Sequence, residues 1–252
     1  MKKAFMIIAA ALSSVTVMSA QDREITVVVD DRTEVKDTTI VKKKHSHLDF
    51  DIPFYHKIKN RDDEAVIGTF GIGALCTDAS APLEFNPQNS LEFFIYTLDS
   101  HTKGHNTLSY GAGVTFRNYV MTGGTAMSLT DSGNLLTGQF PAGSVPKLSK
   151  LRVFSVNAPL LYSCSFGDGF GLTLGPVFNL NASSSIVNKY MSDGEKQKDK
   201  YKNAHCNLVT VDAMFQINLK YVSLYVKYSP MNTMDRKYWP EFRTWTIGIA
   251  PF

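Results

Sequence analysis

The chain has 252 residues, enough for one large domain or two small ones. Hydrophobic residues make up 44%, charged residues 19% and aromatic residues 12%, which is ordinary for a folded protein. The formal net charge is +3. Without the two lysines of the leader described next, 24 Lys and Arg residues stand against 23 Asp and Glu residues. A balance this close to neutral gives no reason to expect a nucleic-acid partner.

Residues 1–20 have the features of a secretory signal peptide. Two lysines follow the first methionine, residues 4–12 form an apolar run, and Ser19 and Ala20 are small residues at the expected cleavage point. The apolar run is too short to span a bilayer, and no later stretch is long and apolar enough for a membrane helix. We therefore expect an exported chain that begins near Gln21.

Residues 21–64 differ from the rest of the chain because they are dense in charge. Two short β-prone pieces within this segment, 25–29 and 38–41, predict at most a small hairpin. After Glu64 charge thins out, and glycines, aromatic residues and alternating hydrophobicity take over. We therefore divide the exported chain into a charged segment, 21–64, and one folded domain, 65–252.

Eight stretches of the folded domain alternate between apolar and polar residues with a period of two, which predicts β-strands. Most are longer than the ~5–6 residues typical of strands in soluble proteins, and they suit the ~9–11 residues that a tilted strand needs to cross a bilayer. No amphipathic helix is predicted between them. The predicted strands are 65–75, 90–98, 107–120, 151–163, 169–180, 207–219, 221–229 and 242–252.

The predicted connections alternate in length. Three are short and lie around residues 99–106, 164–168 and 220–221. The others are long, and two of them, 121–150 and 181–206, are expected to be surface loops. Short turns at one end and long loops at the other are typical of an outer-membrane β-barrel, with the short turns facing the periplasm.

The two faces of the predicted strands indicate which side meets lipid. In 107–120 one face is apolar, and the other carries glycines and Arg117. Glycine adds nothing to a solvated surface, but inside a narrow eight-stranded barrel it leaves room for large side chains opposite. We therefore expect the apolar faces to point outward into lipid. The expected lipid-facing residues are Leu108, Tyr110, Val114, Phe116, Leu172, Leu174, Val211, Phe215 and Ile217.

The inward faces gather charged and amide side chains. Charges enclosed at low dielectric must pair and form hydrogen bonds, and both signs are present, so we expect a neutralising network. In the opposite orientation, that of a soluble barrel, Phe116, Leu174 and Phe215 would meet in a dry interior while Arg117 and Asp212 faced water. The expected interior polar network is Glu92, Arg117, Asn157, Asp212, Gln216 and Lys227, with Asn218 and Lys220 as further inward positions.

No catalytic or metal site is predicted. No histidine lies mid-strand on a predicted lipid face, and no Ser–His–acid set is apparent. His45, His47 and His56 lack the further ligand of a closed metal site, and the three cysteines, Cys76, Cys164 and Cys206, match no metal motif. We therefore expect neither enzyme activity nor a cofactor. An eight-stranded lumen is also too narrow for a diffusive pore.

Two stretches resemble known outer-membrane proteins. Phe252 resembles the terminal aromatic signal that such proteins present to the barrel-assembly machinery, although Pro251 precedes it. Residues 158–180, "APLLYSCSFGDGFGLTLGPVFNL", combine an aliphatic strand containing Pro159, a glycine turn and a Leu-Gly-Pro strand. With these residues, 65–252 resembles the small eight-stranded outer-membrane barrels of the OmpA/OmpX type. More narrowly, it is similar to the PorT-like outer-membrane β-barrel proteins of Bacteroidota.

This resemblance implies an all-β fold, an eight-stranded antiparallel up-and-down transmembrane β-barrel with a charged N-terminal periplasmic segment. It implies the outer membrane of a Gram-negative cell, with outer-membrane lipid, lipopolysaccharide and the barrel-assembly machinery as partners and 21–64 as a contact for a periplasmic protein. We expect a structural, adhesion or protein-interaction component of the envelope, not a pore. The alternatives are a soluble exported ligand-binding barrel and a lipid A-modifying barrel enzyme.

Overall fold

The computed structural model of the chain describes residues 63–79, 83–167, 169–220 and 222–251. The predicted signal peptide, nearly all of the charged segment and Phe252 therefore lie outside the described residues, as do His45, His47 and His56. The chain divides into two units between residues 49 and 50, and the described residues all belong to the second. The strands are β1 (Asp63–Ala79), β2 (Leu91–Lys103), β3 (Asn106–Val120), β4 (Thr125–Leu129), β5 (Leu135–Gln139), β6 (Val145–Ser165), β7 (Phe170–Ser192), β8 (Glu195–Lys202), β9 (Val209–Leu219), β10 (Val222–Ser229) and β11 (Phe242–Pro251).

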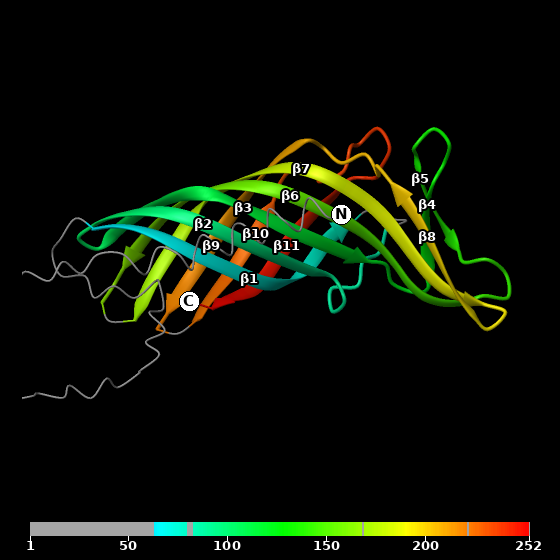
Figure 1. Cartoon of the computed structure of the whole chain (residues 1–252), viewed down its shortest axis with the longest axis horizontal. Helices are drawn as coiled ribbons and strands as arrows, with labels where there is room; N and C mark the ends of the chain where they lie inside the picture. Colours follow the sequence, from blue (N-terminus) through cyan, green and yellow to red (C-terminus); the bar gives the residue numbers. More distant parts are fainter. Residues whose placement is uncertain (1–62, 80–82, 168, 221, 252) are drawn as a thin grey trace, which may run out of the picture. The chain divides into compact units, whose positions relative to one another are not determined.

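Eight of these strands close into an antiparallel barrel (Figure 1). The order around the barrel is β1–β2–β3–β6–β7–β9–β10–β11, and β11 pairs back onto β1. Each strand of the barrel therefore pairs with the barrel strands before and after it in the chain, and closure removes the exposed edges of an open sheet. The predicted all-β, eight-stranded, up-and-down antiparallel barrel is confirmed. The described residues contain no helix long and apolar enough to cross a membrane.

The short turns β2–β3, β6–β7 and β9–β10 share one end of the barrel, which we call the turn end. The β2–β3 turn passes through Gly104 at a φ of 63°, a conformation that suits glycine. The two strands that close the barrel also have one end there. β1 begins at Asp63, which pairs with Thr102, and β11 ends at Pro251, which pairs with Val222. Pro251 lies beyond the last β1–β11 pair, Ile72–Ile249, so its missing N–H breaks no bond of that ladder.

The opposite end of the barrel, which we call the loop end, contains more regular secondary structure than the sequence predicts. The expected loop 121–150 contains the β4–β5 hairpin and the first residues of β6, which begins at Val145. The expected loop 181–206 contains the second half of β7 and all of β8, which folds back along it (Figure 1). These residues lack the regular apolar–polar alternation that predicts a strand, so the prediction of loops was wrong there.

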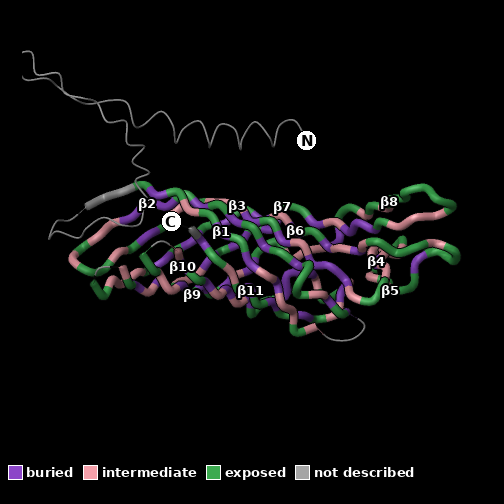
Figure 2. Tube along the Cα trace, turned by 90° about the horizontal axis from the view of Figure 1, so that it is seen from below, coloured by how far each residue is buried: buried purple, intermediate pink, exposed green. Residues whose placement is uncertain are grey.

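Burial alternates along the barrel strands with a period of two (Figure 2). In β2 every second side chain from Glu92 to Ser100 is buried, and those between them are exposed or half-buried. Because successive side chains of a strand point to opposite faces, the buried set faces the barrel interior and the other set faces outward.

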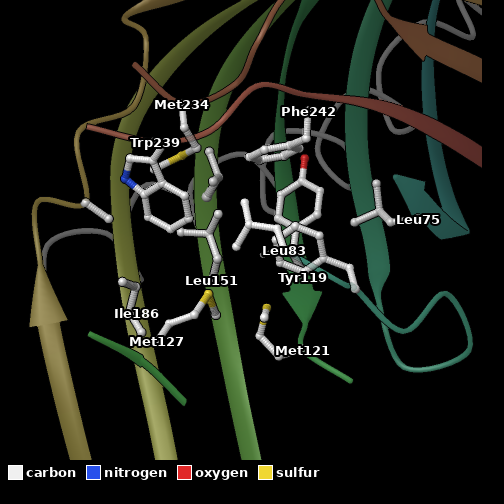
Figure 3. Close-up of a cluster of buried hydrophobic side chains, with 13 residues drawn as sticks. Leu75, Leu83, Tyr119, Met121, Met127, Leu151, Ile186, Met234, Trp239 and Phe242 are labelled. Carbon is white, nitrogen blue, oxygen red and sulfur yellow. The ribbon is translucent and has the colours of Figure 1, made fainter. Parts of the chain in front are cut away.

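Two clusters of buried hydrophobic side chains occupy the interior. The first lies at the loop end, where Met127 of β4 and Met234 and Trp239 of the β10–β11 connection pack against Leu151 and Ile186 (Figure 3). This cluster, the loop-end plug, covers the mouth of the barrel with side chains. The second, the aromatic layer, lies nearer the turn end and contains Phe94, Tyr96, Leu98, Leu161, Val177, Met214, Tyr225 and Ala250.

Candidate functional site

Between the plug and the aromatic layer lies a buried ionic cluster. Glu92, Arg117, Asp212 and Lys227 come from β2, β3, β9 and β10, and each is at most 1% exposed. Arg117 Nε donates to Glu92 Oε2 at 2.8 Å, and Lys227 Nζ donates to Glu92 Oε1 at 2.7 Å. Arg117 also donates to Asp212. Two cations meet two anions, so the enclosed charge is neutral.

Further hydrogen bonds surround the ionic cluster. Ser229 Oγ donates to Asp212 Oδ1, and Lys227 Nζ donates to Tyr96 Oη at 3.0 Å. The same ammonium lies 4.6 Å from the ring centroid of Phe94, in cation–π contact. Charges removed from water are tolerated only when such contacts offset their lost hydration. The aromatic layer and the ionic cluster are therefore one connected structure.

The two amides of the predicted network lie outside the ionic cluster, in separate hydrogen-bond chains. Asn157 accepts from Thr115 at 2.7 Å and donates to Asn179 at 2.5 Å, which links β3, β6 and β7. Gln216 donates to Asn218 at 2.8 Å near the turn end. Asn218 is only half-buried. The expected inward position of Lys220 was wrong, because β9 ends at Leu219 and Lys220 is exposed in the following turn.

Two inward-facing glycines make room for the aromatic layer. A Cβ atom at Gly71 would lie 2.5 Å from the ring of Phe94, and one at Gly73 would lie 2.5 Å from Tyr225 Oη. Any larger residue at these positions would displace a buried ring. The narrow lumen thus explains why glycines occupy these two inward positions.

Little space is left inside the aromatic layer. An interior cavity lined by Phe94, Tyr96, Leu161, Met214 and neighbouring side chains has a volume of about 10 Å³. This is roughly the space that one water molecule needs, and it is far below the ~300 Å³ or more of a small-molecule pocket.

The outer face of the barrel carries a belt of apolar side chains. The nine residues predicted to face lipid are all exposed or half-buried, while their neighbours along each strand are mostly buried. Strand pairing makes the belt continuous: Ile95 pairs with Val114, and Val114 pairs with Val156. Leu174 and Phe215 also pair, on the outside of the barrel. Phe116, Leu174 and Phe215 therefore do not meet in the interior, where Arg117 and Asp212 lie instead.

The histidines and cysteines of the described residues form no shared site. His101 Nε2 lies 3.0 Å from Tyr110 Oη near the turn end, and the ring of His205 stacks on Tyr238 at the loop end. The three cysteines are free. Within the described residues, no group of His, Cys, Asp or Glu side chains is arranged to hold a metal ion.

Sequence reasoning missed one ordered surface. Residues 195–202 fall within the predicted surface loop 181–206, but they form β8, which pairs with β7 and has its lysines on one face and its acidic residues on the other. The signal was present in the sequence, since Lys196, Lys198, Lys200 and Lys202 recur at every second residue. Only the pairing with β7 shows that this period belongs to a strand.

Comparisons with known proteins found similarity in structure only. No protein-family profile matches this chain, and no curated protein matches its sequence. Among solved structures, the chain is similar to the crystal structure of Ail, the attachment invasion locus protein of Yersinia pestis, with 11% identity and a TM-score of 0.38. That match covers 76% of this chain and 99% of Ail. The structure of Ail in complex with the heparin analogue sucrose octasulfate is also similar, with 10% identity and a TM-score of 0.34. This match again covers 76% of this chain and 99% of Ail.

Proposed function

We propose that this protein is an integral outer-membrane β-barrel. In this proposal it is a sealed structural, adhesion or protein-interaction component of the cell envelope, and its loop end faces outside. The observation that carries the proposal is the inverted burial: ionic side chains fill the interior and large apolar side chains cover the outer wall. In water this arrangement would expose the belt, whereas in a bilayer the belt contacts hydrocarbon.

The height of the belt supports this proposal. Outward-facing apolar side chains on β7 run from Phe170 to Leu180. At ~3.3 Å per residue this is about 33 Å along the strand, and a tilt of ~40° reduces it to about 25 Å. The apolar band of outer-membrane barrels is about 25 Å tall.

The filled interior supports a sealed barrel. The loop-end plug, the ionic cluster and the aromatic layer follow one another along the axis. The cavity inside the aromatic layer, about 10 Å³, is too small for the ligand of a soluble carrier protein. We therefore favour a membrane anchor over both a pore and a soluble ligand-binding barrel.

Cell fractionation tests the membrane location. We expect the protein in the outer-membrane fraction, extractable only with detergent. On unheated gels the folded barrel should migrate differently from the boiled chain. A monodisperse protein that leaves the envelope without detergent would reject the proposal.

Epitope insertion tests the orientation. One tag is placed after Gly194 in the β7–β8 turn, and a matched tag is placed after Gly104 in the β2–β3 turn. Antibody should label intact cells only when the tag follows Gly194, because short turns of outer-membrane barrels face the periplasm. Labelling of the Gly104 tag alone would reverse the orientation.

We also propose that the protein acts without catalysis, since the described residues of the belt contain no Ser–His–acid set. Lipid A mass spectra of a deletion strain and a complemented strain should then be identical. A lipid A species that disappears on deletion would favour the lipid A-modifying alternative. We also propose that the protein belongs to the PorT-like group and contacts a periplasmic protein through 21–64. The barrel-assembly machinery is a further proposed partner.

A further inference from the structure

Strands β6, β7 and β8 continue past the apolar belt as a three-stranded sheet at the loop end. One face of this sheet continues the inner wall of the barrel and holds Leu151, Ile186 and Tyr201 against the loop-end plug. The other face continues the outer wall. We call this second face the basic face, and its charged residues are Lys150, Arg152, Lys189, Lys196, Lys198, Lys200 and Lys202.

The register aligns these side chains in rows across the three strands. In the first row, Arg152 pairs with Ser185, which pairs with Lys202. In the second, Lys150 pairs with Val187, which pairs with Lys200. Successive rows lie about 7 Å apart and neighbouring strands about 5 Å apart. Positive charges thus recur at short intervals in both directions of the sheet.

The cations of the basic face have no acidic partners beside them. Asp199 lies on the opposite face, where its charge acts on Tyr190. None of the ion pairs among the described residues includes any of the seven cations. Lys189 even pairs directly with Lys198, an arrangement that is destabilising unless an anion lies between the two.

Mutual repulsion also acts at the start of β6. The pKa of Lys150 is lowered, first by its partial burial and then by the charges of Arg152 and Lys189. An anion bound among these three side chains would relieve that repulsion.

The place of the basic face relative to the belt identifies the kind of anion. On β6 the outward side chains change from Lys150 and Arg152 to Phe154 and Val156 without a gap. If the belt lies in the hydrocarbon of the outer membrane, Arg152 lies at the level of the lipid headgroups. There the anions are phosphate groups, which Arg and Lys bind through charge-assisted hydrogen bonds.

We propose that the basic face binds the phosphate groups of glycolipids in the outer leaflet. This inference rests on the proposed membrane location, because only that location puts the face at the headgroup level. The lower rows contact phosphates at the membrane surface, and the upper cations, Lys189 and Lys196 among them, contact anionic groups of the sugar chain above it. The protein is thereby fixed in depth and rotation within the leaflet.

Lipid titration with matched variants tests the proposal. The full chain is folded in neutral detergent, and the fraction that carries one lipid A molecule is measured by native mass spectrometry. The test variant is Lys198→Gln with Lys200→Gln, and the control is Lys103→Gln with Lys237→Gln, which removes the same charge from exposed lysines away from the face. We expect the test variant to bind bisphosphorylated lipid A about tenfold more weakly than the control.

Two further comparisons make the result specific. Dephosphorylated lipid A should bind the two variants equally, and added salt should reduce the difference between them. Equal binding of bisphosphorylated lipid A by both variants would overturn the proposal. The proposal would also be overturned if the test variant lost binding only to a soluble sulfated polysaccharide, because the basic face would then bind a ligand that is free in solution. A barrel that needs detergent but binds lipid A equally in both variants contradicts only this inference, not the membrane location.

Discussion

Arg117 and Asp212 are 95 residues apart in the chain and form a buried ion pair inside the barrel. Arg117 lies on β3 and Asp212 on β9, with β6 and β7 between them around the wall. The pair therefore crosses the lumen. Glu92 and Lys227 extend it to β2 and β10, so one network ties four strands of the barrel together.

Neutralising one member of this network should destabilise the barrel strongly. Asp212→Asn leaves two cations, Arg117 and Lys227, with Glu92 as their single anionic partner, so the buried ionic cluster carries one uncompensated positive charge. We expect the free energy of unfolding to fall by about 3 kcal/mol, as for other broken buried pairs. The measurement is urea unfolding in lipid vesicles, followed by the heat-dependent gel shift.

Asp131→Asn is the matched control, because Asp131 is exposed in the β4–β5 turn. The control should change the unfolding free energy by no more than about 0.5 kcal/mol. Equal effects of the two substitutions would mean that the interior is hydrated well enough to screen the ion pair.

Replacing both partners of the Glu92–Lys227 pair should lower the free energy of unfolding by less than the sum of the two single substitutions. Glu92→Gln leaves Lys227 facing rings and a hydroxyl, and Lys227→Gln leaves Glu92 with Arg117 alone. The double variant keeps neutrality at this position. We expect a coupling free energy of about 1–3 kcal/mol in a double-mutant cycle. Strict additivity would show that the two side chains do not interact in the folded barrel.

A charged side chain placed on the belt should lower the free energy of unfolding, while the same side chain placed beyond the belt should not. Leu174 and Leu136 are exposed to similar extents, 56% and 53%, but Leu174 lies in the belt and Leu136 in the β4–β5 hairpin. Leu174→Arg should lower the unfolding free energy in lipid vesicles by about 2–4 kcal/mol. Leu136→Arg should have little effect, since its side chain is placed in water. Similar results for both would contradict the membrane location of the belt.

An added methyl group inside the lumen should strain the aromatic layer. The Cβ atom of Gly73→Ala would lie 2.5 Å from Tyr225 Oη and 2.9 Å from the carbonyl oxygen of Ile247, which belongs to the backbone and cannot move freely. We expect a loss of about 1–3 kcal/mol in unfolding free energy. Gly68→Ala is the control, because nothing lies within 4 Å of its added Cβ. A neutral Gly73→Ala would mean that the aromatic layer is loosely packed.

The sequence predicted the strands of the barrel well, because each carries its own signal. In β3 and β9 apolar and polar residues alternate, and the direction of a side chain in a strand depends only on its position in the alternation. The inward positions of Arg117 and Asp212 and the outward positions of Phe116 and Phe215 follow from this rule. The rule fails where a strand ends, as at Lys220, which lies in a turn.

The loop end was predicted poorly because its strands carry no apolar period. The second half of β7 and all of β8 are held by mutual backbone pairing and by the plug beneath Ile186 and Tyr201. Local sequence shows neither the partner nor the plug. The narrower resemblance to PorT-like proteins stays a prediction, since no family profile matches the chain.

The sequence by itself determined the number of barrel strands, their up-and-down order and which residues point inward, because side-chain direction alternates with residue number along each strand. Only the tertiary structure decided which charges meet. Register and closure bring Lys227 to Glu92 across 135 residues and gather the lysines of β8 beside Lys150 and Lys189. Register is a property of strand pairs, and no single strand contains that information.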